Sequence, residues 1–400
     1  MIIKVRAFLV LIFILLIVST FFSFDELVKA QASNENDNVE KKLNENIDNQ
    51  LNHLDFNSIE ELLAEVSGGD LFDNNFMDKV KSILNGDFKV NTGTFFEAII
   101  KLIMSELFTF LPLLATIAAI AILSNLVTNF KSKTLSNSTS EIVFYACYAL
   151  VILLVISNVH NMYELTKRTI DGIRKFSEAV MPVLLTLMVA ANGRVSAKVY
   201  QPAVALMSSG VTEMIDNIIL PIFLISLIFA VISNISKNVR LSKLADFFRS
   251  ASSWILGIVF MVFSAFMSVK GITAGAMDGI SFRAAKFATR SYIPILGGYL
   301  SEGLDLFLTG SVLIKNAVGV AGLALLLALV FVPVIKLIVF GLGIKLTASI
   351  IEPMTDSRMS SFLITVSKNM SILYVSIIAV TFMLFIMIML IILTSNAMIG

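Results

Sequence analysis

The 400-residue chain has few of the residues that enzymes use for catalysis and metal binding. It contains one cysteine, Cys147, and two histidines, His53 and His160, which lie in separate regions. A single cysteine excludes an intrachain disulfide and a cysteine-based metal cluster. The chain has no HExxH, no GxxxxGK[S/T] and no nucleophile with a base beside it. We therefore predict a protein that is not an enzyme and has no catalytic, cofactor-binding or metal-binding residues.

Charged residues are also scarce, at 15% of the chain, whereas a soluble domain carries about 25%. Hydrophobic residues make up 57% of the chain, and the mean hydropathy is +0.87. Several apolar runs approach the roughly 20 residues that a helix needs to cross a bilayer. The basic residues are scattered at loop edges, which gives no support for nucleic-acid binding. These features predict an all-α, polytopic integral membrane protein.

Residues 1–32 have the three parts of a secretory signal peptide. Lys4 and Arg6 precede an apolar core over residues 7–22, and Ala30 and Ala32 form a small-x-small cleavage site. The alternative is a signal anchor that is not cleaved. Both interpretations place the following segment outside the cytoplasm.

Residues 33–106 are predicted to form a small exported acidic helical domain. Between residues 33 and 93 the chain has 13 Asp and Glu against 5 Lys, a net charge of −8. One apolar stripe at helical spacing is typical of an amphipathic helix and consists of Val39, Leu43, Ile47, Leu51 and Leu54. The domain either binds a partner or itself, or is a solvated spacer or weak coiled coil.

Residues 107–178 are predicted to form a two-helix membrane hairpin followed by an amphipathic segment. The two helices cover residues 107–127 and 142–159, and Lys131 and Lys133 lie in the loop between them. The positive-inside rule places this loop in the cytoplasm. The amphipathic stretch over residues 162–176 is expected to lie in the membrane interface.

Four prolines recur in register across the rest of the chain. Pro182 and Pro221 are 39 residues apart, as are Pro294 and Pro333, and the two pairs are offset by 112 residues. Proline in an apolar run kinks or breaks a helix. We therefore predict a duplicated membrane core with proline-broken helices, made of one repeat over 179–270 and a second over 291–400. The alternative is chance recurrence of prolines beside apolar runs.

Each repeat is expected to have roughly four apolar segments, which gives about seven to nine spans after signal cleavage. Residues 179–191 and 199–211 are short for a span. They fit either a pair of thin helices or a re-entrant hairpin.

The predicted linker between the repeats, residues 271–290, is rich in glycine and basic residues. Gly271, Gly275 and Gly279 form GxxxGxxxG, a spacing that lets helices pack closely. The alternative is a flexible loop. The basic residues of this linker are Arg283, Lys286 and Arg290.

Charges inside apolar runs are candidate functional residues, because a charge at membrane depth is costly. Lys336 is the strongest candidate, since apolar residues flank it on both sides. It either lies buried or snorkels to an interface. Weaker candidates, which also fit turns or interfaces, are Lys345, Glu213, Asp216, Glu302 and Asp305. No long span clearly contains a carboxylate.

Several features occur in a characteristic order: the exported acidic N-terminus, Met181-Pro182, Ala190-Ala191-Asn192-Gly193, and a block with Glu352-Pro353, Asp356, Arg358 and Ser367-Lys368 before the last helix. In this order they resemble the stage III sporulation protein AE family. The resemblance implies a place in the mother-cell membrane around the forespore of an endospore-forming bacterium. It also implies a channel-like complex with other proteins of the same operon and a forespore membrane partner.

Three mechanisms agree with the sequence. The protein is an export gate or membrane platform, a secondary transporter with a midplane site, or a scaffold without a pore that assembles neighbours or further copies of itself. Besides such proteins, its expected partner is the lipid bilayer.

Overall fold

All the elements in the described part of the chain are helices. The computed structural model describes residues 37–52, 54, 56–66, 76–85, 92–129, 137–235, 241–292 and 296–396. The predicted signal peptide with Ala30 and Ala32, and also Pro294, lie outside these residues. Three short helices, α2 (Asp37–Asn52), α3 (Asn57–Val66) and α4 (Phe76–Leu84), precede the long ones. The predicted all-α class is confirmed.

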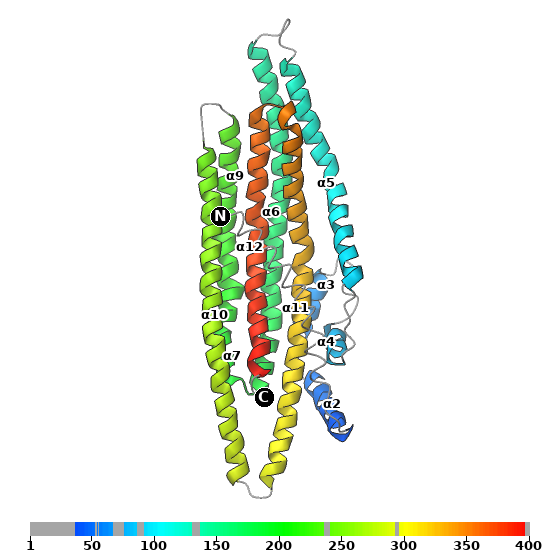
Figure 1. Cartoon of the computed structure of the whole chain (residues 1–400), viewed down its shortest axis with the longest axis vertical. Coiled ribbons are helices and arrows are strands. Elements are labelled where there is room, and N and C mark those ends of the chain that lie inside the picture. The colour runs from blue at the N-terminus through cyan, green and yellow to red at the C-terminus, as the bar shows by residue number, and fades with distance from the viewer. Residues whose placement is uncertain are drawn as a thin grey trace.

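The long helices follow one another as an up-and-down bundle (Figure 1). They are α5 (Thr92–Asn129), α6 (Asn137–Ala190), α10 (Ser242–Tyr292), α11 (Leu296–Ile351) and α12 (Ser357–Asn396). Between α6 and α10 a single rod joins α7 (Arg194–Ala205), η2 (Leu206–Val211), α8 (Thr212–Met214), η3 (Ile215–Ile219) and α9 (Leu220–Ile235). We call the end of the bundle where α11 passes through η4 (Glu352–Met354) into α12 the upper end, and the end where α6 turns into α7 the lower end.

Six helical segments of the described chain are long and apolar enough to cross a membrane. They are Ile99–Val127, Glu141–Ala190, Arg194–Ile235, Lys243–Ser281, Asp305–Met354 and Ser357–Thr394. This is fewer than the seven to nine spans expected from the sequence. The difference arises because apolar runs predicted as separate spans are joined in single helices, most clearly in α11.

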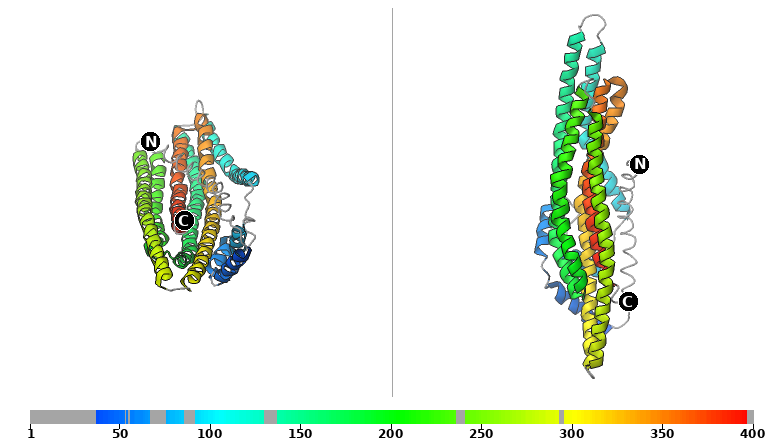
Figure 2. Two further views of the ribbon diagram at one scale, coloured as in Figure 1. Left: turned by 60° about the horizontal axis from the view of Figure 1, so that its bottom comes forward. Right: turned by 90° about the vertical axis from the view of Figure 1, so that its left-hand side faces the viewer.

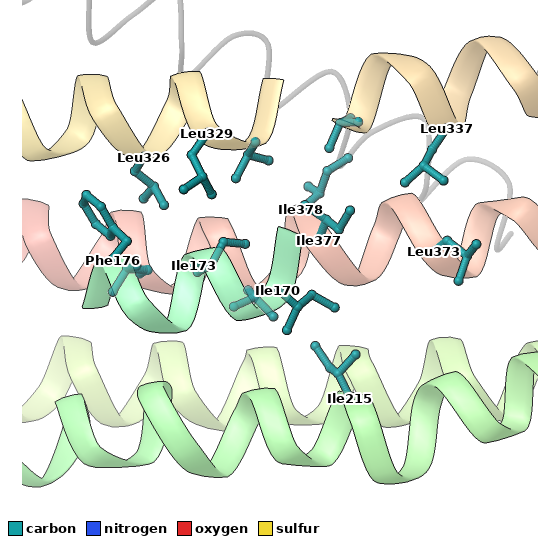
Figure 3. Packing of buried hydrophobic residues seen from close by; sticks show 14 of the residues in the cluster. Ile170, Ile173, Phe176, Ile215, Leu326, Leu329, Leu337, Leu373, Ile377 and Ile378 are labelled. Atoms are coloured by element: carbon teal, nitrogen blue, oxygen red, sulfur yellow. The ribbon is translucent and has the colours of Figure 1, made fainter. Parts of the chain in front are cut away.

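Helix α12 forms the centre of the bundle. It packs against α6, α9, α10 and α11. In its apolar 18-residue stretch, 67% of the residues are buried. Figure 3 shows Leu373, Ile377 and Ile378 of α12 between side chains of α11 and α6. The sequence of α12 is apolar on all its faces over residues 372–393, and such a helix is stable only where other helices or lipid cover it all round.

The prolines do not end the helices in which they lie. Pro182 is inside α6 and Pro333 is inside α11. Pro221 is the second residue of α9 and follows the π-helical segment η3. A π-turn changes the backbone ladder where a proline ring would meet the carbonyl group one turn earlier. The predicted thin segments are therefore parts of longer helices: 179–190 ends α6, and 199–211 lies in the rod that leads to α9.

The structure does not confirm the predicted duplication. An offset of 112 residues would place the turn over 191–193, between α6 and α7, on residues 303–305. Those residues lie inside the continuous helix α11. This turn is therefore not repeated, whereas at the same offset the end of α9 and the start of α10 fall near the end of α11 and the start of α12. The duplication stays a prediction.

Residues 271–290 belong to α10 and form no loop. Two of the three glycines of the GxxxGxxxG spacing face other helices. A Cβ atom at Gly271 would lie 2.6 Å from the Tyr200 hydroxyl oxygen of α7, and one at Gly275 would lie 2.8 Å from Thr394 Cγ2 of α12. A Cβ atom at Gly279 would meet nothing within 4 Å. The close approach of α10 to α7 and α12 therefore depends on Gly271 and Gly275.

This geometry predicts opposite effects for two neighbouring substitutions. Gly275→Ala overpacks the contact with Thr394 and should lower the free energy of unfolding by about 1–3 kcal/mol. Gly279→Ala adds a methyl group in open space and should leave stability unchanged or raise it by up to about 1 kcal/mol, because alanine favours the helix. Thermal unfolding of the purified variants in detergent measures both. Equal melting temperatures would show that Gly275 is not at a tight contact.

Candidate functional site

The lower end of the bundle contains a turn held by a carboxylate from another helix. Asn192 has a left-handed backbone conformation with φ of 64°, and a Cβ atom at Gly193 would lie 2.9 Å from the Met188 carbonyl oxygen. These two residues let the chain reverse sharply between α6 and α7. The backbone N–H groups of Val195 and Ser196, in the first turn of α7, donate to the two carboxylate oxygens of Asp278, each at 2.8 Å.

Asp278 is fully buried and belongs to α10, next to the packing glycines. Its negative charge meets the positive N-terminal end of the α7 dipole and satisfies two N–H groups that have no partner within the helix. Asp278 was not among the candidate residues of the sequence analysis. Sequence alone could not assign it as a cap, since cap and helix are more than 80 positions apart.

The lower end of α12 is bound by two further polar contacts. The Lys315 ammonium group of α11 is fully buried and donates to the carbonyl oxygens of Ile391 and Ile392, at 3.0 Å each. The hydroxyl groups of Tyr200 and Thr394 share a hydrogen bond of 3.1 Å beside Gly271. Lys315 was not among the sequence candidates. Its isolated position in the apolar run 311–323 was a usable signal, of the same kind that pointed to Lys336.

Lys336, the leading sequence candidate, has an acidic partner on α5. Its ammonium nitrogen lies 3.7 Å from Glu106 Oε2, and the side chains are 35% and 13% exposed, respectively. Glu106 Oε2 is buried and accepts no hydrogen bond from the described residues. Glu106 lies inside Ile99–Val127, a segment long and apolar enough to cross a membrane, so this candidate span contains a carboxylate that the sequence analysis placed outside it.

In the sequence-based prediction, Glu106 was the last residue of the exported domain 33–106. The structure instead starts α5 at Thr92 and continues it without a break to Asn129. The apolar residues on both sides of Glu106, Ile103 and Leu107, were the signal that could have placed it within a span.

The other candidate charges do not gather at one site. Lys345 and Glu213 are exposed, and the side chain of Glu302 lies outside the described ones. The Asp216 carboxylate of η3 interacts electrostatically with Lys167 and Arg174 on α6. Asp305 is half-buried on α11, on the lower half of the bundle. Among the side chains that the structure describes, no three His, Cys, Asp or Glu are grouped so that they could hold a metal ion.

At the upper end, the block after Glu352-Pro353 fastens the turn between α11 and α12 to α6. The Arg358 guanidinium group donates to both carboxylate oxygens of Asp356, at 3.1 Å and 3.0 Å. Its central carbon lies 3.7 Å from the centre of the Phe144 ring of α6, a cation–π contact. Ser367 donates to the Gly341 carbonyl oxygen at 2.7 Å, which joins α12 to α11 below the turn.

These polar groups hold helices together, and none is arranged as a nucleophile with a base. The fold and these contacts define a multi-pass helical membrane protein with a packed centre. The sequence model described as stage III sporulation protein AE matches residues 74–395, and the chain belongs to this family. The family predicted from the sequence is confirmed. It is a family of sporulation proteins and not a known enzyme family.

A curated relative supports the same assignment. The chain is 26% identical over 313 residues to the stage III sporulation protein AE of Bacillus subtilis (strain 168), and the match covers 78% of each chain. No solved structure matches the chain.

The ion pair between α5 and α11 predicts a coupled pair of substitutions. Glu106→Gln or Lys336→Gln alone leaves one charge without its partner at membrane depth, where an unpaired charge costs about 2.5–3.5 kcal/mol. The double substitution should cost less than the sum of the two singles. Thermal unfolding in detergent and the amount of protein in the membrane measure this. Strictly additive effects would mean that the two charges do not interact.

The capping contact predicts that Asp278→Ala lowers the free energy of unfolding by about 1–2 kcal/mol. Asp278→Asn keeps one acceptor oxygen and should fall between Asp278→Ala and the unaltered protein. Asp246→Ala is a suitable control, because Asp246 is 55% exposed in its ion pair with Arg249 and exposed pairs contribute little. The comparison is made by thermal unfolding, with proteolysis at the 191–193 turn as a local probe. An Asp278→Ala variant as stable as Asp246→Ala would refute the cap.

Proposed function

We propose that the chain is a non-enzymatic membrane platform of the channel complex that joins mother cell and forespore, and that forespore development requires it. Membership of the sporulation family supports the cellular setting. The polar contacts described above support a role in holding helices and partners rather than in chemistry.

The packing of α12 is the single observation that favours a platform over a gate within one chain. Its buried side chains run from Met359 near the upper end to Thr394 near the lower end. Apolar side chains of α6 and α11 close around it (Figure 3). The centre of the bundle is therefore filled with side chains, and a conduit would have to form between this chain and other copies or partners.

The proposed location is the mother-cell membrane around the forespore, with α2, α3 and α4 on the exported side after cleavage at Ala30 and Ala32. The N-terminal helices lie near the lower half of the bundle, whereas the upper end carries the basic residues Lys243, Arg249 and Arg358. Basic residues favour the cytoplasmic side, but the lower half also carries Lys198 and Lys270, so the proposed orientation depends on the exported N-terminal helices. The proposed protein partners are other products of the same sporulation operon and a membrane protein of the forespore.

The pair Glu106–Lys336 favours a second candidate function, a secondary transporter. Ionisable residues at membrane depth mark ion and substrate pathways in such proteins. A transporter would need these two charges for its activity, whereas a platform would need them only for folding. The two functions therefore differ in what happens when both charges are removed and the fold is kept.

The test uses an endospore-forming strain in which the double variant Glu106→Gln, Lys336→Gln replaces the unaltered chain. The platform predicts normal numbers of heat-resistant spores whenever the variant reaches normal levels in the membrane. A tagged chain should also retain proteins of the same operon on purification. Loss of spores at a normal protein level would support the transporter instead. The control is a deletion strain, in which the platform predicts that heat-resistant spores are lost.

A further inference from the structure

We infer that lipid covers only the upper half of the bundle, and that the lower half stands in water on the side of the membrane that holds α2, α3 and α4. The proposal concerns an interaction surface whose partner is the hydrocarbon of the bilayer. It does not depend on the channel function proposed above.

The length of the helices is the first observation. Helix α6 has 54 residues and α11 has 56 residues. At 1.5 Å per residue each is about 80 Å long, whereas the hydrocarbon core of a bilayer is about 30 Å thick. A large part of each helix must therefore leave the lipid, unless the helices lie nearly flat. Figure 1 shows them almost parallel to the long axis of the bundle, so they could lie flat only if the whole bundle did.

Exposed apolar side chains form a continuous belt around the upper half. On the rod and on α10 the belt extends from Ile218 to Ile235 and from Leu244 to Val269. These lengths are about 26 Å and about 38 Å, which bracket the thickness of the hydrocarbon core. Helices α5, α6 and α11 complete the belt with Leu107, Phe108, Leu111, Leu123, Leu126, Ile142, Leu150, Leu153, Ile156, Leu342, Leu346 and Ile350.

Below the belt, polar residues appear at outward-facing positions of α6, α10 and the rod. On α6 the change comes at His160 and Asn161, and on α10 it comes at Lys270. On the rod, Asn217 and Glu213 are exposed just below Ile218, and Lys198 and Arg194 follow toward the lower end. Large apolar side chains are still exposed here. Val189 and Leu206 stand singly, which water tolerates, whereas Met277, Ile280 and Phe287 share one side of α10 with polar residues such as Ser281 and Arg283.

Helix α6 carries a charged surface through this lower half. Arg174 lies 2.6 Å from Asp171 and 3.9 Å from Glu178, and Lys175 lies 3.7 Å from Asp171, with every one of these side chains 40% or more exposed. Lys167 and Arg168 are exposed one turn earlier. Each charge would cost about 2.5–3.5 kcal/mol at the bilayer centre, so a row of them facing lipid is excluded. The prediction of an interfacial segment over 162–176 is replaced by a helix that continues out of the membrane.

The N-terminal helices provide an independent observation, because they pack on the lower half. Gln50 of α2 accepts a hydrogen bond of 2.8 Å from Ser311 of α11 and lies beside Gly310. Helix α4 also packs on α11, and α3 packs on α6. These helices expose charged residues such as Glu45, Asp48 and Asp78 on their outer side. Polar helices attached there require that this part of the bundle is surrounded by water.

The lower half is a rigid extension of considerable height. From Ile156 to Ala190, α6 extends about 50 Å beyond the belt. The contacts of Asp278, Lys315 and Tyr200 all lie in this part, which explains why its helices stay together without lipid around them.

Cysteine labelling tests the boundary. Cys147→Ser provides the background, and single cysteines replace exposed residues in matched pairs on the same helix or rod. The belt positions are Leu153 on α6 and Ile228 on α9, and the lower positions are Arg168 on α6 and Lys198 on α7. A membrane-impermeant maleimide is added to intact membranes. We expect the maleimide to label Arg168→Cys and Lys198→Cys and to leave Leu153→Cys and Ile228→Cys unlabelled.

A cysteine in place of Asp48 in α2 identifies the side of the membrane that holds the N-terminal helices. It should react with maleimide from the same side as the two lower positions. Denaturation in detergent should make all the belt positions reactive, which shows that protection comes from the membrane and the fold. Protection of Arg168→Cys and Lys198→Cys equal to that of the belt positions would overturn the inference. Labelling of the lower positions from the side opposite to Asp48→Cys would overturn it as well.

Discussion

The burial of α12 is the constraint on which the rest of the structure depends. A helix that is apolar on every face must be covered all round, and the backbone groups of any helix in lipid must be paired within it. Helices α6, α9, α10 and α11 supply that cover over the whole length of α12. Helices α6, α10 and α11 accompany α12 over more than the thickness of a bilayer (Figure 2). The same packing fills the centre of the bundle.

Polar contacts occur where the helices must be fixed to one another at particular positions. Apolar packing is non-directional, so it sets which helices are neighbours but only weakly sets their register. Asp278 binds the start of α7, Lys315 binds the end of α12, and Arg358 stacks on α6 at the opposite end. Charged hydrogen bonds of this kind are shorter and stronger than neutral ones. Together they hold both ends of a bundle whose sides are apolar.

The family, the packed centre and the boundary between lipid and water support one another. A sporulation membrane protein with a filled core acts through the surfaces that it presents, and the lower half offers such a surface well away from the lipid. Exposed charges and the helices α2, α3 and α4 are found there. The Glu106–Lys336 pair lies at the lower edge of the belt, below Leu107 and Leu342, and joins the peripheral helix α5 to α11.

The sequence by itself determined the helical membrane class and the family. These follow from local composition, spacing and order, which need no knowledge of neighbours in space. Only the tertiary structure decided that Pro182 and Pro333 lie inside continuous helices, since packing on both sides of a proline can hold a helix together. It alone also joined Glu106 to Lys336 and Asp278 to α7. Such pairs are far apart in the chain, and hydrophobic periodicity carries no information about which faces meet.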